Sequence, residues 1–260
     1  MERRLAEVLL NFPGDLASYS ASDFARFAHV SNATVSRFFR KLGYANFDAA
    51  RRHIRAERQS GAALLLLGQS DSTQDSVIEA HDRQGHANLT RTFAALSIAD
   101  VDSAVQGMLQ ARRVWIIGFR TGHALANYLY WQVLQVVDRA VLLPVAGQTL
   151  AEYIAGIDPD DMVILFDFKR RPRLLDKTIQ IITARGAGMM VISDMPRELP
   201  QSRVAWHFQC QTTAPGPLFN HTSALALCHL IATRAIQLAS ASARKRLALI
   251  ETLHEDLDDF

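Results

Sequence analysis

The segment from Ser22 to Gly43 has the sequence SDFARFAHVSNATVSRFFRKLG, in which apolar residues recur at spacings of three and four. This is the period of amphipathic α-helices, and it predicts two short helices joined by a tight turn. Ser31 is expected to cap the second helix, because its hydroxyl can accept a hydrogen bond from an N–H at the helix start. The residues predicted to pack inward are Phe24, Phe27 and Ala28 on the first helix, and Val35, Phe38, Phe39 and Leu42 on the second.

The polar side of the second helix has the chemistry that reading a DNA groove requires. Short polar side chains at the helix start can contact base edges, and cations further along can contact phosphates. The candidate DNA-binding residues are Ser31, Asn32, Thr34, Ser36, Arg37, Arg40 and Lys41. Residues 26 to 58 contain eight basic and two acidic side chains, so double-stranded DNA would meet a field of one sign. The alternative is a small helical bundle whose basic face is only solvated.

A longer segment, residues 21 to 55, resembles the N-terminal helix-turn-helix of the RpiR/MurR family of transcriptional regulators. The shared pattern is a helix, the turn Val30-Ser31, a helix ending R-F-x-R-K-L-G at Gly43, then Tyr44, Phe47 and a further helix. A glycine suits the end of a helix, where a residue that accepts a positive φ is often needed. The resemblance implies a bacterial regulator that binds operator DNA.

Between residues 113 and 238, short apolar runs rich in β-branched residues alternate with longer amphipathic segments. The runs are VWIIG (114–118), AVLLPV (140–145), MVILF (162–166), MMVIS (189–193) and VAWHF (204–208). Strands that alternate with helices predict a doubly wound α/β domain with a parallel five-stranded sheet. This pattern is similar to the sugar isomerase (SIS) domain, which in the RpiR family follows the helix-turn-helix bundle and binds phosphosugars.

The expected domains follow from these two regions and from a cluster of Gly, Ser, Gln and Asp after residue 60, which is typical of a linker. Ser97 is expected to cap a helix over 101–111 that leads into the first strand. The predicted boundaries are 1–75 for the helix-turn-helix DNA-binding domain, 76–94 for a linker helix, 95–245 for an SIS effector-binding and oligomerisation domain, and 246–260 for a C-terminal tail.

The loop after the first strand is a candidate site for an anion. A glycine turn before a helix can present backbone N–H groups to an anion, with help from the positive end of the helix dipole. Gly118, Arg120 and Thr121 are the candidates there, and Thr121 could add its hydroxyl. Asn220 and Thr222, at the start of the last long helix of the sheet region, are secondary candidates, because capping that helix is the simpler explanation for them.

The loop after the third strand departs from the SIS pattern, which has Ser-x-Ser-Gly-x-Thr at this place to hold a phosphate. Here the sequence is Asp167-Phe-Lys-Arg-Arg-Pro-Arg173, so the usual hydroxyls are missing. Its cations could bind a carboxylate or phosphate through charge and a bidentate fork, with Asp167 orienting one arginine. The loop could equally be a solvated or subunit-contacting basic surface. The candidates for effector binding are Asp167, Lys169, Arg170 and Arg171.

The sequence favours a sensor over an enzyme. Glu152, His123 and His221 are candidates for an acid or base only by type and rough location, and the altered loop and the DNA-binding head argue against catalysis. Neither a metal site nor a cofactor is suggested, because Cys210 and Cys228 form no paired CxxC motif and no HExxH motif occurs. The longest apolar run, residues 62–67, is too short to span a membrane, so we expect a cytoplasmic protein.

Three functions remain at this point. The first is a homodimeric or homotetrameric transcriptional regulator whose SIS domain senses a small anionic effector, a sugar phosphate or sugar acid, and so controls binding to operator DNA. The second is a sugar-phosphate isomerase with a helical appendage, which would turn over its substrate and would not retain specific DNA. The third is a regulator whose SIS domain only oligomerises, which would bind its operator regardless of metabolites.

Overall fold

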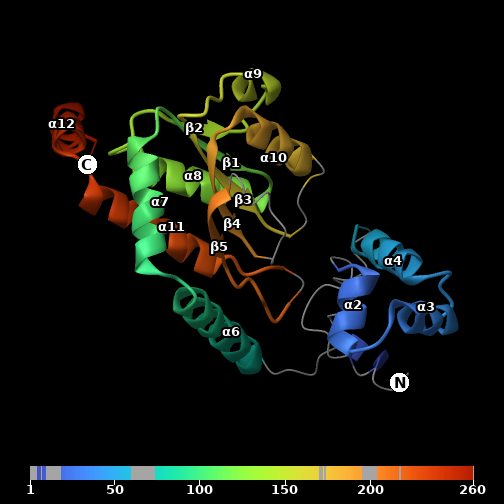
Figure 1. Cartoon of the computed structure of the whole chain (residues 1–260). Coiled ribbons are helices and arrows are strands. Elements are labelled where there is room, and N and C mark those ends of the chain that lie inside the picture. Colours follow the sequence, from blue (N-terminus) through green and yellow to red (C-terminus); the bar gives the residue numbers. More distant parts are fainter. Residues whose placement is uncertain are drawn as a thin grey trace. The chain divides into compact units, whose positions relative to one another are not determined.

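The computed structural model describes residues 5–6, 8–9, 19–59, 74–169, 172, 174–194, 204–216 and 218–259. The chain divides into two compact units, Met1–Thr73 and Gln74–Phe260, which are described separately here (Figure 1). The first is helical and the second is a parallel sheet flanked by helices, which confirms the predicted fold class.

The first unit is built around three aromatic rings, one from each of its helices α2 (Ala21–Ala28), α3 (Asn32–Lys41) and α4 (Phe47–Gln59). The ring centroids of Phe24 and Phe39 lie 5.8 Å apart, and those of Phe39 and Phe47 lie 5.0 Å apart in an edge-to-face arrangement. All three rings are at most 2% exposed. Large aromatic rings dominate a core of this size because each buries much apolar area.

Hydrogen bonds at both ends of α3 fix where this helix begins and ends. Ser31 caps the start, as predicted, and its side chain accepts a hydrogen bond from the Thr34 N–H at 3.3 Å. At the other end Gly43 adopts a φ of 90°, and the Tyr44 N–H bonds to the Phe39 carbonyl at 3.0 Å. This is the Schellman geometry that the glycine predicted.

The prediction that Phe27 and Leu42 lie in the core of this unit is wrong. The side chains of Phe27 and Leu42 are each 48% exposed. On α2 the buried residues are Phe24, Ala25 and Ala28, and at 3.6 residues per turn Phe27 is turned by roughly 100° from the centre of that face. Leu42 is the C-cap residue of α3, so it lies just beyond the helical face that buries Phe38 and Phe39.

The second unit contains a five-stranded parallel sheet in the order β2-β1-β3-β4-β5. Each of the five predicted runs forms one of its strands, and the strands begin and end close to where the sequence placed them. Their bounds are β1 (Val114–Gly118), β2 (Ala140–Leu143), β3 (Met162–Asp167), β4 (Gly188–Ser193) and β5 (Val204–Gln209).

Helices cover both faces of the sheet. In Figure 1, α7 (Ile98–Gln110), α8 (Thr121–Val133) and α11 (Thr222–Leu238) lie on one face, and α9 (Ala151–Ile154) and α10 (Leu174–Arg185) lie on the other. Side chains alternate along β1 accordingly: Ile116 packs with the first group and Ile117 with the second. Full burial of such a side chain contributes about 1.5–3 kcal/mol relative to leaving it exposed.

The remaining helices of this unit are α6 (Gln74–Ala94) and α12 (Ala241–Leu257). Helix α6 packs against α11. Ser97 caps α7 as predicted, although the helix begins three residues earlier than expected. Among the described helices none is by itself long and apolar enough to cross a membrane; only α11 and α12 together meet the length and composition, and they are bent by 109°.

The positive φ of Gly43 gives a first prediction. Replacing Gly43 with Ala adds a Cβ that meets no atom within 4 Å, so the cost is the left-handed backbone alone. We expect the Gly43→Ala variant to lose about 1 kcal/mol of stability in the first unit, measured by hydrogen exchange of α3 amides. Gly216→Ala is the matched control, because its Cβ also has open space but its φ is not positive. Equal protection of α3 in both variants would contradict the capping role.

Candidate functional site

The order of the strands determines where a ligand can enter the sheet. Strand β1 lies between β2 and β3 in the sheet. The connection from β1 to β2 therefore runs to one side of β1, and the connection from β2 to β3 crosses to its other side. At such a switch point the loops after the two central strands separate and open a crevice outside their carboxyl ends. Here these loops follow Gly118 on β1 and Asp167 on β3.

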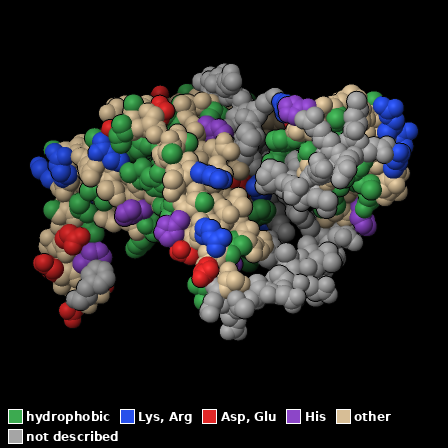
Figure 2. All heavy atoms as spheres, turned by 90° about the horizontal axis from the view of Figure 1, so that it is seen from below, with side chains coloured by type: hydrophobic (Ala, Val, Ile, Leu, Met, Phe, Trp, Pro, Cys, Tyr) green, Lys and Arg blue, Asp and Glu red, His purple; other side chains and the backbone are tan. Residues whose placement is uncertain are grey.

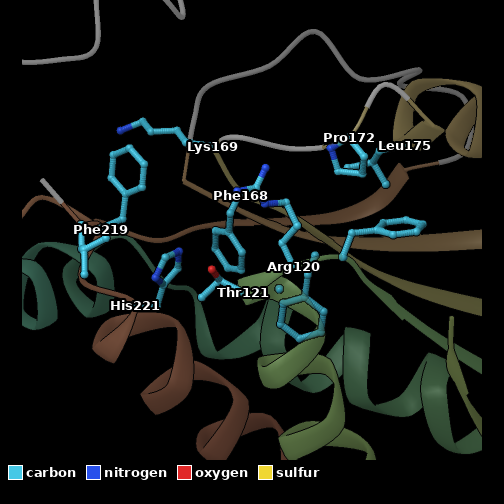
Figure 3. A pocket seen from close by; sticks show the side chains of 12 residues that line it. Arg120, Thr121, Phe168, Lys169, Pro172, Leu175, Phe219 and His221 are labelled. Carbon is cyan, nitrogen blue, oxygen red and sulfur yellow. The ribbon is translucent and has the colours of Figure 1, made fainter. Parts of the chain in front are cut away.

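A pocket of about 280 Å³ lies at this point (Figure 3). Three segments supply its walls: the turn between β1 and α8, the loop between β3 and α10, and the loop that precedes α11. The lining residues are Phe119, Arg120, Thr121, Gly122, Phe166, Phe168, Lys169, Pro172, Leu175, Leu218, Phe219 and His221.

The turn between β1 and α8 carries Arg120 in an unusual backbone conformation. Its φ is 56° and its ψ is −126°, while the Gly122 N–H bonds to the Phe119 carbonyl at 3.0 Å. A residue other than glycine in this region costs about 1–3 kcal/mol and persists only where the surroundings hold it. The close approach of strand and helix supplies that constraint, because a Cβ on Gly118 would lie 2.2 Å from the Gly122 carbonyl oxygen.

The loop between β3 and α10 contributes a second cation to the pocket, Lys169. The Lys169 backbone N–H donates to the Asp194 carboxylate at 3.0 Å, and its ammonium lies 5.1 Å from the centroid of the Phe219 ring. Within the described part of the chain, neither Arg120 nor Lys169 forms an ion pair. Two cations without a carboxylate partner favour an anionic ligand between them.

His221 forms part of the floor of the pocket. Its ring lies edge-to-face with Phe168 at a centroid distance of 5.0 Å. Burial among these rings lowers the pKa of His221, although the nearby Asp194 carboxylate acts in the opposite direction. The lowered pKa favours the neutral imidazole, so Arg120 and Lys169 are the main source of positive charge in the site.

The structure brings some of the predicted effector residues together and leaves others outside the pocket. Arg120, Thr121 and Lys169 line it. Gly118 and Thr222 are chain neighbours of lining residues but do not line the pocket, and Asp167 is 3% exposed at the end of β3. Asn220 accepts a hydrogen bond from the Thr222 N–H at 2.9 Å, one residue before His221, the N-cap residue of α11. Arg170 and Arg171 fall outside the described residues.

Two of the three acid–base candidates do not line the pocket. Glu152 is exposed, and a hydrogen bond from Thr149 lowers the pKa of its carboxyl. A ring nitrogen of His123 is 3.3 Å from the Gly118 carbonyl oxygen. Only His221 lines the pocket. No aspartate or glutamate lines the pocket in the part of the chain described here.

The sequence analysis missed the aromatic walls of the pocket. Phe119 and Phe168 are direct neighbours of predicted residues, and Phe219 precedes Asn220 by one position. Each phenylalanine follows the end of a strand or precedes a helix, which is where open α/β sheets bind ligands, and this position was the available signal.

On the first unit, α3 presents the candidate DNA contacts. Arg37, Arg40 and Lys41 are exposed on α3, on the side away from Val35 and Phe39. Among the described residues, Arg37 and Arg40 have no ion-pair partner. Figure 2 shows Lys and Arg side chains gathered at the right-hand edge of the view, where this unit lies.

The residues at the start of α3 form hydrogen bonds within the unit. The hydroxyls of Ser31 and Thr34 lie 2.9 Å apart, and the Asn32 amide donates to the Ser22 hydroxyl at 3.1 Å. These bonds hold the leading turn of α3 in one geometry. Ser36 is half-buried on the next turn.

Comparison with known proteins agrees with the division into a helical unit and a sheet unit. The helix-turn-helix domain of the rpiR family matches residues 1–61, and the SIS domain matches residues 107–234. Together these domains define the class of transcriptional regulators that carry a sugar isomerase domain. The chain belongs to the RpiR family of helix-turn-helix transcriptional regulators, as the sequence predicted.

Individual relatives support the same assignment. The transcriptional regulator HexR of Pseudomonas aeruginosa is 30% identical over 200 residues, which are 73% of this chain and 66% of that protein. Among solved structures, the SIS domain of an RpiR factor from Sphaerobacter thermophilus aligns with this chain at 19% identity and a TM-score of 0.60. The alignment spans 67% of this chain and 97% of that domain. The NanR protein of Vibrio vulnificus, complexed with ManNAc-6P, aligns with this chain at 15% identity and a TM-score of 0.67. The alignment spans 98% of this chain and 93% of NanR. At these identities the structures establish the fold.

The strained turn at Arg120 gives a second prediction. We expect the Arg120→Gly variant to gain about 1 kcal/mol in the free energy of unfolding, measured in urea, because glycine accepts the φ of 56° without strain. Arg120→Ala removes the guanidinium but keeps the strain, so it is the matched control. A glycine variant no more stable than the alanine variant would contradict the strain at this turn.

Proposed function

We propose that this protein controls transcription by binding operator DNA through its helix-turn-helix, and that a small anionic effector in the pocket at the switch point alters that binding. The observation that carries the proposal is a pocket with two cations, Arg120 and Lys169, on the same chain as a basic recognition helix. We assign 1–75 to the DNA-binding domain, 76–94 to a linker helix, 95–245 to the effector-binding and oligomerisation domain, and 246–260 to a C-terminal tail. A homodimer or homotetramer in the cytoplasm fits a regulator that must reach paired operator half-sites.

For the DNA contacts, the proposal divides the residues of α3 by chemistry. Arg37, Arg40 and Lys41 supply cations for phosphates or for guanine edges in the major groove. The remaining contacts come from Ser36 and from the capped first turn, which includes Ser31, Asn32 and Thr34. A helix whose leading turn is held by hydrogen bonds enters the groove with little loss of conformational entropy.

For the effector, the proposal places the anion between Arg120 and Lys169, with the Thr121 hydroxyl beside them. Arg170 and Arg171 continue the loop of Lys169 and are proposed as further ligands for the anion. Gly118, Asp167, Asn220 and Thr222 are proposed to shape the site without direct contact. Sugar phosphates and sugar acids are the starting candidates, because the similar NanR structure holds ManNAc-6P.

The proposal makes the SIS domain a sensor and not an enzyme. An aldose–ketose isomerase needs a base that removes a proton from carbon, and a carboxylate commonly serves. Glu152 is exposed away from the pocket, and His221 is engaged with Phe168. Turnover of a sugar phosphate by the purified chain would favour the isomerase instead.

A chain of hydrogen bonds leads from the pocket toward the interior of the unit. The Asp194 carboxylate accepts from the Lys169 N–H at 3.0 Å and from the Thr212 hydroxyl at 2.8 Å. Asp194 and Thr212 are 7% and 2% exposed. Because one carboxylate holds both loops, an anion that moves Lys169 also moves the loop around Thr212.

That loop is in turn bonded to α6. The Gln211 N–H donates to the Thr92 hydroxyl at 2.9 Å, and the Asn88 side chain donates to the Thr213 carbonyl at 2.7 Å. Thr92 and Asn88 are at most 1% exposed, so these bonds are costly to break without replacement. Helix α6 is also the first element of the second unit after the segment that leads from the DNA-binding head.

The proposed mechanism is a population shift through α6. An effector that prefers one position of the pocket loops biases the position of α6, and so the spacing of two recognition helices in the oligomer. Operator half-sites lie roughly 34 Å or a multiple of it apart, so a change of spacing weakens simultaneous binding. The effector can change the affinity for DNA only to the extent that it binds one arrangement of the oligomer more tightly than the other.

Removal of a guanidinium from α3 tests the DNA interface. We expect the Arg37→Ala variant to lose about 1–3 kcal/mol of operator binding if Arg37 reads a base, and to weaken all sequences evenly if it holds a phosphate. Gel-shift titrations with operator and scrambled duplexes distinguish these cases. Arg83→Ala, an exposed arginine on α6, controls for the change of net charge. An Arg37→Ala variant with unchanged affinity for both duplexes would remove Arg37 from the interface.

An isosteric change in α6 tests the coupling. The Thr92→Val variant keeps the volume but leaves the Gln211 N–H without its acceptor, so we expect effector binding to persist while the effector's influence on operator affinity falls toward none. Coupling free energies between sites are typically about 1–3 kcal/mol.

The measurement has two steps. A thermal-shift panel of sugar phosphates, sugar acids and other small carboxylates identifies the tightest binder, and operator titrations with and without it give the coupling for each variant. Thr90→Val, at an exposed position of the same helix, is the control. If Thr92→Val responds to the effector as the unmodified chain does, α6 does not transmit the signal by this route.

A further inference from the structure

Most of the residues that line the pocket are apolar. Four of its lining residues are phenylalanines, namely Phe119, Phe166, Phe168 and Phe219, and Pro172, Leu175 and Leu218 add further apolar surface. The Phe166 and Phe168 rings lie 6.1 Å apart at an angle of 41°, and Phe168 meets His221 edge-to-face. Such rings stabilise a flat ligand by offset or edge-to-face packing.

The polar groups of the pocket are cations more than hydroxyls. Arg120 and Lys169 supply positive charge, and Figure 3 shows Arg120 beside Thr121 with Lys169 next to the Phe219 ring. Among the described lining residues, Thr121 supplies the only hydroxyl and none supplies an amide side chain or a carboxylate. This set suits one anionic group on an apolar body.

A polyhydroxylated ligand fits these walls poorly. Each sugar hydroxyl that loses its water and finds no partner weakens binding by roughly tenfold. The hydroxyls of a hexose would face Phe168, Phe219 and Leu218, whose side chains offer no hydrogen bond. A flat apolar ligand loses nothing at these positions and gains from burying its surface.

We propose that the pocket selects an aromatic carboxylate, with the carboxylate held between Arg120 and Lys169 and the ring packed among Phe119, Phe168 and Phe219. The inference rests on the proposed function, because it assigns the chemical class of the effector for the same site. His221 lies against Phe168 in the floor of the pocket, which adds a further aromatic ring to its walls. A pocket of about 280 Å³ is at the lower end of the size of small-molecule sites, as a single-ring ligand requires.

A pair of probes with equal charge tests this inference on the full chain. Phenylacetate and gluconate each carry one carboxylate, but the first has a ring and the second has a hydroxylated chain. We expect calorimetric titration to give phenylacetate a Kd at least tenfold below that of gluconate and that of glucose 6-phosphate.

Two variants locate the binding. Phe219→Leu keeps an apolar side chain but removes the ring, and we expect it to weaken phenylacetate binding at least fivefold and to weaken gluconate binding by a smaller factor, because the ring also contacts the Lys169 ammonium. Phe93→Leu, at an exposed phenylalanine of α6, is the matched control and should bind both probes as the unmodified chain does.

The failures of the two proposals can be told apart. Tighter binding of gluconate or glucose 6-phosphate than of phenylacetate overturns the ligand class and leaves a sensor of sugar derivatives. The ligand class is also overturned if the Phe219→Leu variant binds phenylacetate as tightly as the unmodified chain does. It is overturned as well if none of the three probes binds at 10 mM, on the order of the weakest specific affinities. Failure of the ligand-free chain to bind operator DNA contradicts the proposed function and says nothing of the pocket.

Discussion

The contact between the end of β1 and the first turn of α8 is the constraint on which the second unit depends. The absence of a Cβ at Gly118 lets the helix begin directly against the central strand, since an added Cβ would lie 2.2 Å from the Gly122 carbonyl oxygen. This approach holds Arg120 in its positive φ and directs the start of α8 toward the crevice that opens between β1 and β3. The pocket is therefore a consequence of how closely one strand and one helix can pack.

The same unit combines a rigid core with a polar network that can respond to a ligand. The strands next to the pocket are buried on both faces, so they deform little. The loops after β3 and β5 are joined through the Asp194 carboxylate, and the loop after β5 is bonded to Thr92 on α6. In the proposed mechanism, a small anion that binds Lys169 influences α6 at the other end of that network.

Sequence periodicity predicted much of this structure because burial imposes it directly. All five strands follow from apolar runs, and the caps at Ser31 and Ser97 follow from the hydrogen-bonding needs of helix ends. Phe27 was misplaced because spacing alone does not resolve the edge of a helical face. Helix α12 was expected only as a tail: none of its described residues is buried, so its sequence lacks the core-facing period of the other helices.

The candidate site was harder to predict than the fold. Arg120, Thr121 and Lys169 were found because each follows a predicted strand. The aromatic walls come from positions near 119, 168 and 219, which only the topology of the sheet brings together. The prediction for the loop after β3 relied on the number of its basic residues. Whether a residue lines the pocket depends instead on whether its side chain faces the crevice.

The most direct test of the account is the affinity of the effector in the presence and absence of operator DNA. Coupling between two sites is reciprocal, so the factor by which the effector changes operator affinity must equal the factor by which the operator changes effector affinity. We predict a shift of at least fivefold in the Kd of the tightest effector when saturating operator duplex is added to the full chain. An effector Kd that is the same with operator duplex, with scrambled duplex and with neither would contradict the central claim that one chain links the pocket to DNA.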